Sequence, residues 1–155
     1  MRARVGHSFI KADMARLNAV FGGEHSAHFY FRDFFYADSG MLAAMHVLAA
    51  LGTQGRPLSE LLAPYTPYAA SGEINTTVTD AAAATQRVVA ELGGVGCTLD
   101  HLDGVTIDHW DAEPRWWLNV RSSNTEPLLR LNVEAADRAL MESIRDRALA
   151  IIRER

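Results

Sequence analysis

Short runs of alternating apolar and polar residues fill the second half of the chain, and they predict strands that are buried on one face. The clearest runs are residues 116–120 and 128–133, and weaker runs are residues 73–79, 98–100 and 105–110. An Asp-Gly turn signal between two of the runs favours antiparallel neighbours. In the two clearest runs the apolar side carries Trp116, Leu118, Val120, Leu129, Leu131 and Val133.

Two runs in the same half have the spacing of amphipathic helices. One covers residues 80–92, with Thr79 as the expected N-cap and Gly93-Gly94 as the stop signal. The other follows Asp137, a second N-cap candidate, and keeps apolar residues on one side up to Ile152. Helices and antiparallel strands in this order predict a small α+β domain with the helices packed on one face of the sheet.

The beginning of the chain predicts a helix followed by an extended segment. The helix is expected over residues 8–19, with Ser8 as its N-cap. The glycines Gly22 and Gly23 then interrupt the pattern, and residues 24–31 alternate like a strand or an extended loop. The apolar stripe of the helix is expected to carry Ile10, Met14 and Leu17.

A second helix is predicted after Asp38 or Ser39, either of which is a suitable N-cap, and it should end near Gly52. A short helix over residues 57–62 follows, before two prolines break the chain. The change of rhythm places a domain boundary near residue 70. One face of the second helix should be apolar, with Met41, Met45 and Leu48.

The composition limits the possible partners. Hydrophobic residues make up 48% of the 155 positions and charged residues 22%, as expected for a globular protein. The formal net charge is -4 and no run of Lys or Arg occurs, so we expect no nucleic-acid partner. No apolar stretch is long enough to span a bilayer, and no membrane partner is expected. A single cysteine, Cys97, fits a cytoplasmic protein.

The segment between the two clearest strands is the strongest candidate for a binding site. It is rich in hydroxyl and amide side chains, and such loops can turn backbone N–H groups toward an anion. The alternation puts Arg121 and Arg130 together on the polar side of the predicted strand pair. Guanidinium groups match phosphate oxygens well. The alternative is a polar hairpin whose arginines are simply solvated.

The same stretch, which reads Arg-Ser-Ser-Asn-Thr-Glu-Pro-Leu-Leu-Arg from Arg121 to Arg130, closely resembles the phosphate-binding loop in the fourth domain of α-D-phosphohexomutases. In that family the loop holds the substrate phosphate that is not reacting. The resemblance implies phosphate contacts from Arg121, Ser123, Asn124, Thr125 and Arg130.

A second candidate segment lies near the start of the chain. If residues 22–28 are extended, alternation places Glu24, Ser26 and His28 on one side, where they suit recognition of sugar hydroxyls. A plain polar loop and a metal site formed by Glu24, His25 and His28 are the alternatives. The segment resembles the third-domain sugar loop of the same family, a Gly-Glu-x-Ser-Gly-His pattern, but Ala27 replaces the usual glycine.

His7 is a candidate catalytic residue. It lies next to an expected helix N-terminus, where anions are favoured, although a histidine there can also have no ligand. Residues 5–11 resemble another third-domain segment of the family. There the corresponding histidine lines the active site and assists proton transfer or phosphate binding.

The resemblance covers nearly the whole chain. It implies a partial α/β third domain over residues 1–70, followed by the small α+β C-terminal domain over residues 71–155. It also implies a phosphomannomutase or phosphoglucomutase that interconverts hexose 6-phosphate and hexose 1-phosphate through a bisphosphate. Mannose and glucose phosphates are both compatible with the sequence.

Two parts of the family's machinery have no counterpart in this sequence. There is no Asp-x-Asp-x-Asp run for Mg²⁺ and no serine in the Ser-His-Asn-Pro context of the phosphoserine. We therefore expect the chain to bind no metal, to be inactive alone, and to need the N-terminal domains of the same enzyme as partners. The alternative is a non-catalytic module that binds sugar phosphates or takes part in an interaction.

Overall fold

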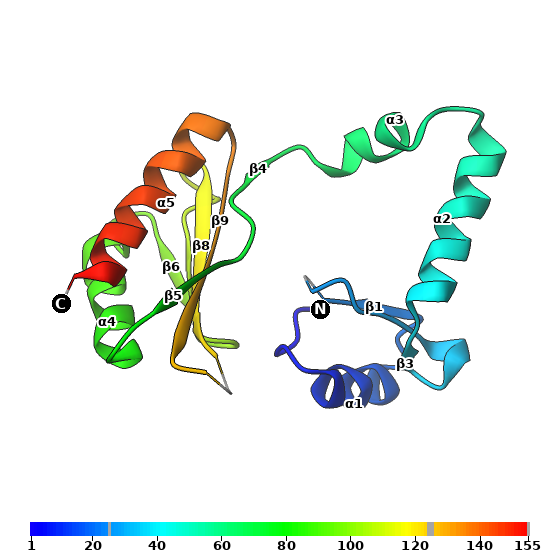
Figure 1. The fold of residues 1–155 in the computed structure, drawn as a ribbon, viewed down its shortest axis with the longest axis horizontal. Helices are drawn as coiled ribbons and strands as arrows, with labels where there is room; N and C mark the ends of the chain where they lie inside the picture. Colours follow the sequence, from blue (N-terminus) through cyan, green and yellow to red (C-terminus); the bar gives the residue numbers. More distant parts are fainter. Residues whose placement is uncertain (25, 124–125, 155) are drawn as a thin grey trace. The chain divides into compact units, whose positions relative to one another are not determined.

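The computed structural model describes residues 1–24, 26–123 and 126–154 (Figure 1). The chain folds as two compact units, Met1–Tyr65 and Thr66–Arg155, which we call the N-terminal and C-terminal units. Both combine helices with antiparallel sheets, which confirms the predicted mixed fold class. Within the described residues, no helix has the length and apolar character needed to cross a membrane.

The C-terminal unit is built on a six-stranded antiparallel sheet with the order β4-β9-β8-β7-β6, and β5 also pairs with β9. The strands β8 and β9 are the two clearest runs of the sequence, and Leu118 lies opposite Val133 in their register. The strands are β4 (Ala69–Ala70), β5 (Ile74–Thr77), β6 (Thr98–Asp100), β7 (Val105–Asp108), β8 (Trp116–Ser122) and β9 (Leu128–Ala135).

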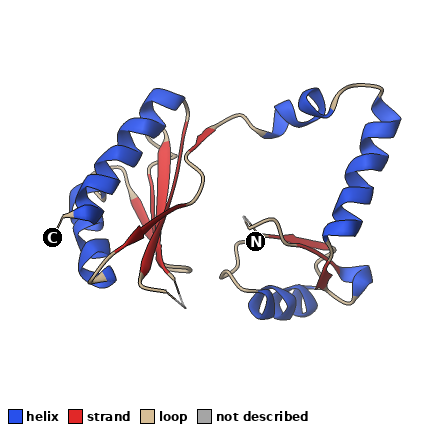
Figure 2. Ribbon diagram, in the orientation of Figure 1, coloured by secondary structure: helices blue, strands red, loops and turns tan. Residues whose placement is uncertain are grey.

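Two helices, α4 (Ala81–Leu92) and α5 (Arg138–Arg153), cover the same face of this sheet (Figure 2). The alternate apolar residues of β8 and β9 point toward these helices and are fully or almost fully buried: Trp116, Leu118, Val120, Leu129, Leu131 and Val133. The opposite face carries the polar residues of the same strands. The alternation in the sequence therefore sorts the sheet into a core face and a polar face. The helices contribute Ala84, Val88, Leu92, Met141, Ile144, Ala148, Leu149 and Ile152 to the core.

The caps of these helices are only partly as predicted. Asp137 caps α5, because its Oδ1 accepts a hydrogen bond from the Leu140 N–H at 2.9 Å. For α4 the predicted cap Thr79 is wrong. The cap is Asp80, whose carboxylate accepts from the Ala83 N–H at 2.9 Å and so leaves Thr79 outside the helix.

The N-terminal unit has a three-stranded antiparallel sheet with the order β1-β2-β3. Its small core joins Tyr30 of β2 to Ile10 and Met14 of α1. Gly22 of β1 allows this close packing, since a Cβ there would lie 2.7 Å from the Met14 Sδ. The elements are α1 (His7–Leu17), β1 (Phe21–Gly23), β2 (Phe29–Phe31), β3 (Ala37–Asp38), α2 (Gly40–Gln54) and α3 (Leu58–Leu62), with short 3₁₀ turns at Arg32–Phe34 and Ala63–Tyr65.

Three predictions for this unit were wrong or incomplete. Ser8 is not a cap, because α1 begins one residue earlier, after Gly6. Leu17, expected on the apolar stripe, is exposed. Ser39 does cap α2 by accepting from the Leu42 N–H at 3.2 Å, but no described residue of α2 is buried. The predicted apolar face of this helix, formed by Met41, Met45 and Leu48, is exposed.

Candidate functional site

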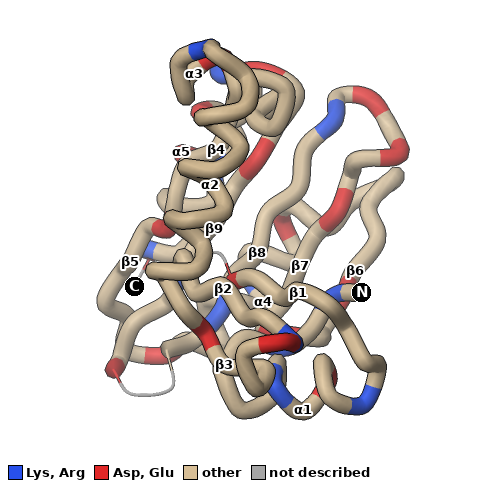
Figure 3. Tube along the Cα trace, turned by 90° about the vertical axis from the view of Figure 1, so that its right-hand side faces the viewer, with Lys and Arg blue, Asp and Glu red and all other residues tan. Residues whose placement is uncertain are grey.

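Arg121 and Arg130 lie directly opposite each other on the polar face of the C-terminal unit. Arg121 is near the end of β8 and Arg130 is near the start of β9, and the antiparallel register pairs them. Basic and acidic residues are interspersed along both units (Figure 3), so this pair is a local feature rather than part of a basic surface. Two like charges in directly opposed positions would destabilise the sheet unless something neutralised them.

Glu73 and Asp103 provide that neutralisation. The Glu73 Oε1 lies 3.2 Å from the Arg130 Nη1, and the Glu73 Oε2 lies 3.7 Å from the Arg121 Nη2. The Asp103 Oδ2 lies 3.4 Å from the Arg121 Nε. Both guanidinium groups are mostly shielded from solvent, with the Arg121 side chain 16% exposed. The result is a compact group of two cations and two anions on one face of the sheet.

The turn before β7 brings Asp103 to this place. The Asn119 amide donates to the Asp103 backbone carbonyl at 2.9 Å and to the Thr106 hydroxyl at 3.0 Å. Gly104 has φ = 70°, and a Cβ there would lie 2.4 Å from the Val120 carbonyl oxygen and 2.9 Å from the Arg121 Cα. Only glycine lets this turn rest against the backbone of Arg121.

The loop that joins β8 to β9 holds the other predicted phosphate contacts. The Ser123 N–H donates to the Leu128 carbonyl at 2.8 Å, which closes the base of the loop. Asn124 and Thr125 lie outside the described residues. The structure therefore brings Ser123 to the base of the loop and Arg121 and Arg130 to the adjoining sheet.

In the N-terminal unit, the predicted sugar-binding residues lie on a tight turn rather than on the extended segment that the alternation indicated. The Ala27 N–H donates to the Glu24 carbonyl at 3.0 Å, and the Glu24 N–H donates to the His28 carbonyl at 2.9 Å. Ala27 has φ = 64°, a conformation that suits glycine better. A glycine would adopt this conformation without strain.

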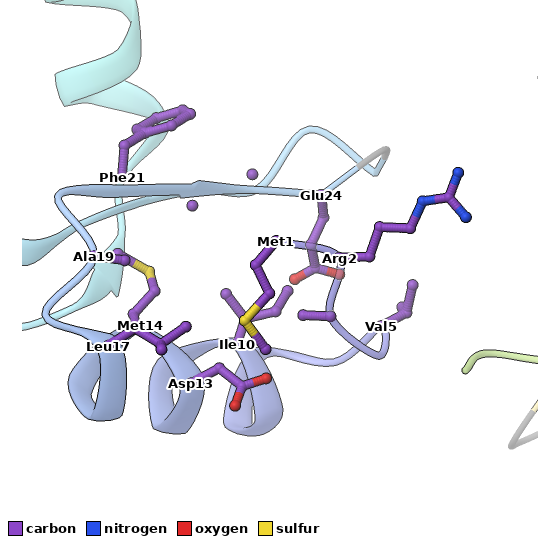
Figure 4. Close-up of a pocket in the computed structure, with 13 residues that line it drawn as sticks. Met1, Arg2, Val5, Ile10, Asp13, Met14, Leu17, Ala19, Phe21 and Glu24 are labelled. Atoms are coloured by element: carbon purple, nitrogen blue, oxygen red, sulfur yellow. The ribbon is translucent and has the colours of Figure 1, made fainter.

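Glu24 is held by two hydroxyl groups. The buried Tyr30 phenol donates to the Glu24 Oε1, and the Ser26 hydroxyl lies 3.5 Å from the Glu24 Oε2. Burial raises the pKa of Tyr30, and the hydrogen bond to Glu24 raises it further, so the phenol stays a donor. Glu24 also lines a pocket of about 480 Å³ beside α1 and β1, toward which its side chain projects (Figure 4).

His28 pairs with Asp38 across the same end of the sheet. The Nδ1 of His28 lies 2.9 Å from the Asp38 Oδ2, and this hydrogen bond raises the pKa of His28 above its ordinary value. The same hydrogen bond lowers the pKa of Asp38, and the charge of His7 lowers it slightly further. His7 is the exposed first residue of α1.

The sequence interpretation missed four residues that organise these two groups: Tyr30 and Asp38 in one unit, and Glu73 and Asp103 in the other. Asp38 was read only as a cap candidate and Asp103 only as a turn signal. Among the described residues, no group of three or more His, Cys, Asp or Glu is placed to hold a metal ion. His25, part of the alternative metal site, lies outside the described residues.

Comparison with known proteins assigns each unit to a protein family model. Residues 1–68 match "Phosphoglucomutase/phosphomannomutase, alpha/beta/alpha domain III", and residues 73–151 match "Phosphoglucomutase/phosphomannomutase, C-terminal domain". These two matches together account for most of the chain.

Relatives and a solved structure agree with this assignment. "Phosphohexose mutases" of Xanthomonas campestris are 49% identical over 140 residues, which is 89% of this chain and 30% of the relative. A phosphomannomutase of Escherichia coli is 42% identical over 153 residues, which is 97% of this chain and 33% of the relative. A crystal structure of a phosphoglucomutase/phosphomannomutase family protein from Burkholderia thailandensis aligns with a TM-score of 0.73 and 26% identity, covering 97% of this chain and 32% of that one.

Proposed function

Because the chain belongs to the phosphoglucomutase/phosphomannomutase family, as its two family matches show, we propose that it forms the substrate-holding part of a hexose-phosphate mutase. The complete enzyme would interconvert hexose 6-phosphate and hexose 1-phosphate through a bisphosphate. The chain spans about a third of the length of the relatives described above, so the reacting groups would come from the rest of the enzyme.

The single observation that supports this proposal best is the pairing of Arg121 with Arg130. Two guanidinium groups in register on one face of a sheet, at the base of a loop rich in hydroxyl groups, suit a phosphate dianion. Arg121, Ser123 and Arg130 would bind the phosphate that is not reacting, together with Asn124 and Thr125.

The N-terminal unit would bind the sugar. The Glu24 carboxylate, with Ser26 beside it, offers acceptors for vicinal hydroxyl groups, while Tyr30 fixes the direction of the carboxylate. His28 is held by Asp38 and would be available as a proton donor over a wider pH range than a free histidine. His7, the first residue of α1, would be the catalytic histidine that assists proton transfer or contacts a phosphate.

The family implies a magnesium ion in the complete enzyme, but the donor groups of the described residues do not fit a Mg²⁺ site. The carboxylates of Glu73 and Asp103 face arginines, and the carboxylate of Glu24 faces Tyr30 and Ser26. Mg²⁺ prefers several oxygen ligands in octahedral geometry. We therefore assign no step of the reaction to a metal held by this chain.

An NMR titration of the 155-residue chain with mannose 1-phosphate and glucose 1-phosphate tests this function. Binding should be weak, with a Kd of about a millimolar, and should perturb amides of residues 121–130. Arg121→Gln should weaken this binding about tenfold, whereas Arg145→Gln, at the Arg145–Asp146 ion pair on α5, should leave it unchanged. Perturbation confined to other residues would refute the assignment.

A turnover assay separates the enzyme fragment from an independent catalyst. The pure chain should show no conversion of mannose 1-phosphate to mannose 6-phosphate with Mg²⁺, because no phosphoserine segment is present in its sequence. Conversion that copurifies with the chain would contradict its proposed role as an enzyme fragment that is inactive alone.

A further inference from the structure

We infer, on the basis of the function proposed above, that Glu73 is a positioning residue that stands in for the phosphate group when no ester is bound. Its carboxylate holds Arg121 and Arg130 in place and must leave before a phosphate binds between them. Glu73 thereby keeps the site formed but also lowers its affinity for phosphate.

The geometry of the carboxylate resembles that of a bridging phosphate. Its Oε1 lies 3.2 Å from the Arg130 Nη1, and its Oε2 lies 3.5 Å from the same Nη1 and 3.7 Å from the Arg121 Nη2, so the carboxylate reaches both guanidinium groups. A phosphate dianion would use the same donors in the same way. Since both ligands are anionic and need the same donors, they would compete for this position.

Glu73 is placed so that it can move away. It lies immediately before β5, whose first residue pairs with Leu131, so the Glu73 backbone is at the end of a strand rather than inside it. Its side chain is 31% exposed. Rotation of the side chain into solvent would therefore disturb neither the core nor the hydrogen bonds of β5.

Asp103 is the contrasting partner that should stay in place. It contacts the Nε of Arg121 from the turn that Gly104 presses against the Arg121 backbone. Its own backbone is tied to Asn119. When Glu73 leaves, Arg121 thus keeps one carboxylate neighbour, and its guanidinium still has Nη donors to offer a phosphate.

Arg130 shows that the bridged arrangement is incomplete. Its Nη1 donates to Glu73, but its buried Nε has no hydrogen-bond partner among the described residues. A buried donor without a partner is unfavourable. The guanidinium therefore gains if it turns from Glu73 to a ligand with more acceptor oxygens.

This competition suits the proposed reaction. A bisphosphate that must turn over in the site has to be released by the phosphate loop and bound again from its other end. A carboxylate that replaces the leaving phosphate would speed that release, because the arginines are never left without an anion. The prediction is that removing the Glu73 charge tightens phosphate binding.

The test compares two variants of the 155-residue chain that change the net charge equally. Glu73→Gln is close in shape and loses the competing charge. Glu134→Gln, on the same face of β9, loses a carboxylate that accepts a hydrogen bond from the Trp117 Nε1 at 3.1 Å and contacts neither arginine. Inorganic phosphate is the probe, and the Arg Nε–H resonances in NMR report on the guanidinium groups.

We expect Glu73→Gln to bind phosphate about fivefold more tightly than wild type, a change of about 1 kcal/mol. Glu134→Gln should bind like wild type, and Glu73→Asp should restore the weaker binding. Amide shifts of β5 show whether Glu73→Gln keeps the fold. If the substitution only released Arg121 and Arg130 from their positions, phosphate binding would weaken rather than tighten.

Three outcomes would overturn the inference. Equal tightening by both Gln variants would show a general effect of charge. Unchanged or weaker binding by Glu73→Gln, with clear binding by wild type, would refute the competition but leave the phosphate site standing. If neither wild type nor Glu73→Gln binds phosphate at the arginines, the proposed function fails together with the inference.

Discussion

The two units of the chain carry their candidate binding groups on different foundations. In the C-terminal unit, the paired arginines lie on a six-stranded sheet whose other face is covered by two helices and a continuous apolar core. In the N-terminal unit, the described buried core consists of Ile10, Met14 and Tyr30. The two arginines thus have a self-supporting scaffold, whereas Glu24, Ser26 and His28 depend on a hairpin with few buried contacts.

The two units also hold their charged groups in different ways. The C-terminal unit balances two arginines with two carboxylates that come from distant parts of the chain. The N-terminal unit uses local pairs within one hairpin and its neighbouring strand, such as Glu24 with Tyr30 and His28 with Asp38. Loss of a local pair should alter one side chain, while loss of a distant pair should alter the shape of the site.

The largest expected difference is in local stability. Amides of β8 and β9 should exchange with solvent at least about a hundredfold more slowly than those of α2, because the first are buried under two helices and no described residue of α2 is buried. Hydrogen exchange followed by NMR measures both in one sample. Equal protection of Leu131 and Met45 would break the comparison.

A matched pair of leucine substitutions tests the difference in burial between the two units. Leu131→Ala should cost about 3–5 kcal/mol, because Leu131 is 0% exposed in the core, whereas Leu48→Ala should cost less than about 0.5 kcal/mol, because Leu48 is 64% exposed. Tryptophan fluorescence in urea follows the C-terminal unit, where all three tryptophans lie, and far-UV circular dichroism in urea also follows the helices of the N-terminal unit, where Leu48 lies. Similar losses from both substitutions would contradict the assigned burial.

Glycine substitutions test the same difference in packing, and their expected effect is smaller. Gly104 and Gly55 both have positive φ, but a Cβ at Gly55 meets nothing within 4 Å, while at Gly104 it meets the backbone of Val120 and Arg121. Gly104→Ala should therefore cost about 2–3 kcal/mol in the urea transition and displace Arg121. Gly55→Ala, followed by far-UV circular dichroism because its unit has no tryptophan, should cost only about 1 kcal/mol, from its positive φ alone. A wild-type transition for Gly104→Ala would show that the turn can move away from β8.

The smallest expected effect concerns pH. Because Asp38 raises the pKa of His28, their pairing stabilises the N-terminal unit fully below the ordinary histidine pKa of about 6.5, and this contribution is lost as pH rises through the raised value. The lowered pKa of Asp38 sets the acid limit, since its contribution is lost as pH falls through that value. The pair therefore stabilises the unit most between the lowered pKa of Asp38 and the raised pKa of His28.

Asp38→Asn should return the His28 pKa toward its ordinary value, as measured from the imidazole resonances. Asp33→Asn, which removes a carboxylate paired with Arg32 in the same unit, is the matched control and should leave it unchanged. Identical titration of His28 in both variants would contradict the assigned pair.

Much of the fold follows from local patterns. Trp116, Leu118 and Val120 predicted the core face of β8, and Asp137 predicted the start of α5. The failures have local causes too. A hydrogen bond turns the chain between Glu24 and Ala27. Alternation of residue types does not predict it, because the same short pattern occurs in a strand and in a tight hairpin.

The candidate site divides in the same way. Arg121 and Arg130 were predicted to meet because they share the polar side of two consecutive strands. Glu73 and Asp103 could not be placed, because they reach the arginines through the pairing of β5 with β9 and of β7 with β8, which no local pattern specifies. Both carboxylates lie near the end of a predicted strand, and this position is the sequence signal that would have identified them.

The central claim is that the two arginines bind one and the same phosphate, and a double-mutant cycle tests it most directly. Affinity for mannose 1-phosphate would be measured by NMR for wild type, Arg121→Gln, Arg130→Gln and the double variant. Each single change should weaken binding about tenfold, and the double change should weaken it far less than the product of the two, because the groups share one ligand. Losses that multiply, or a single variant that binds like wild type, would contradict a shared phosphate site.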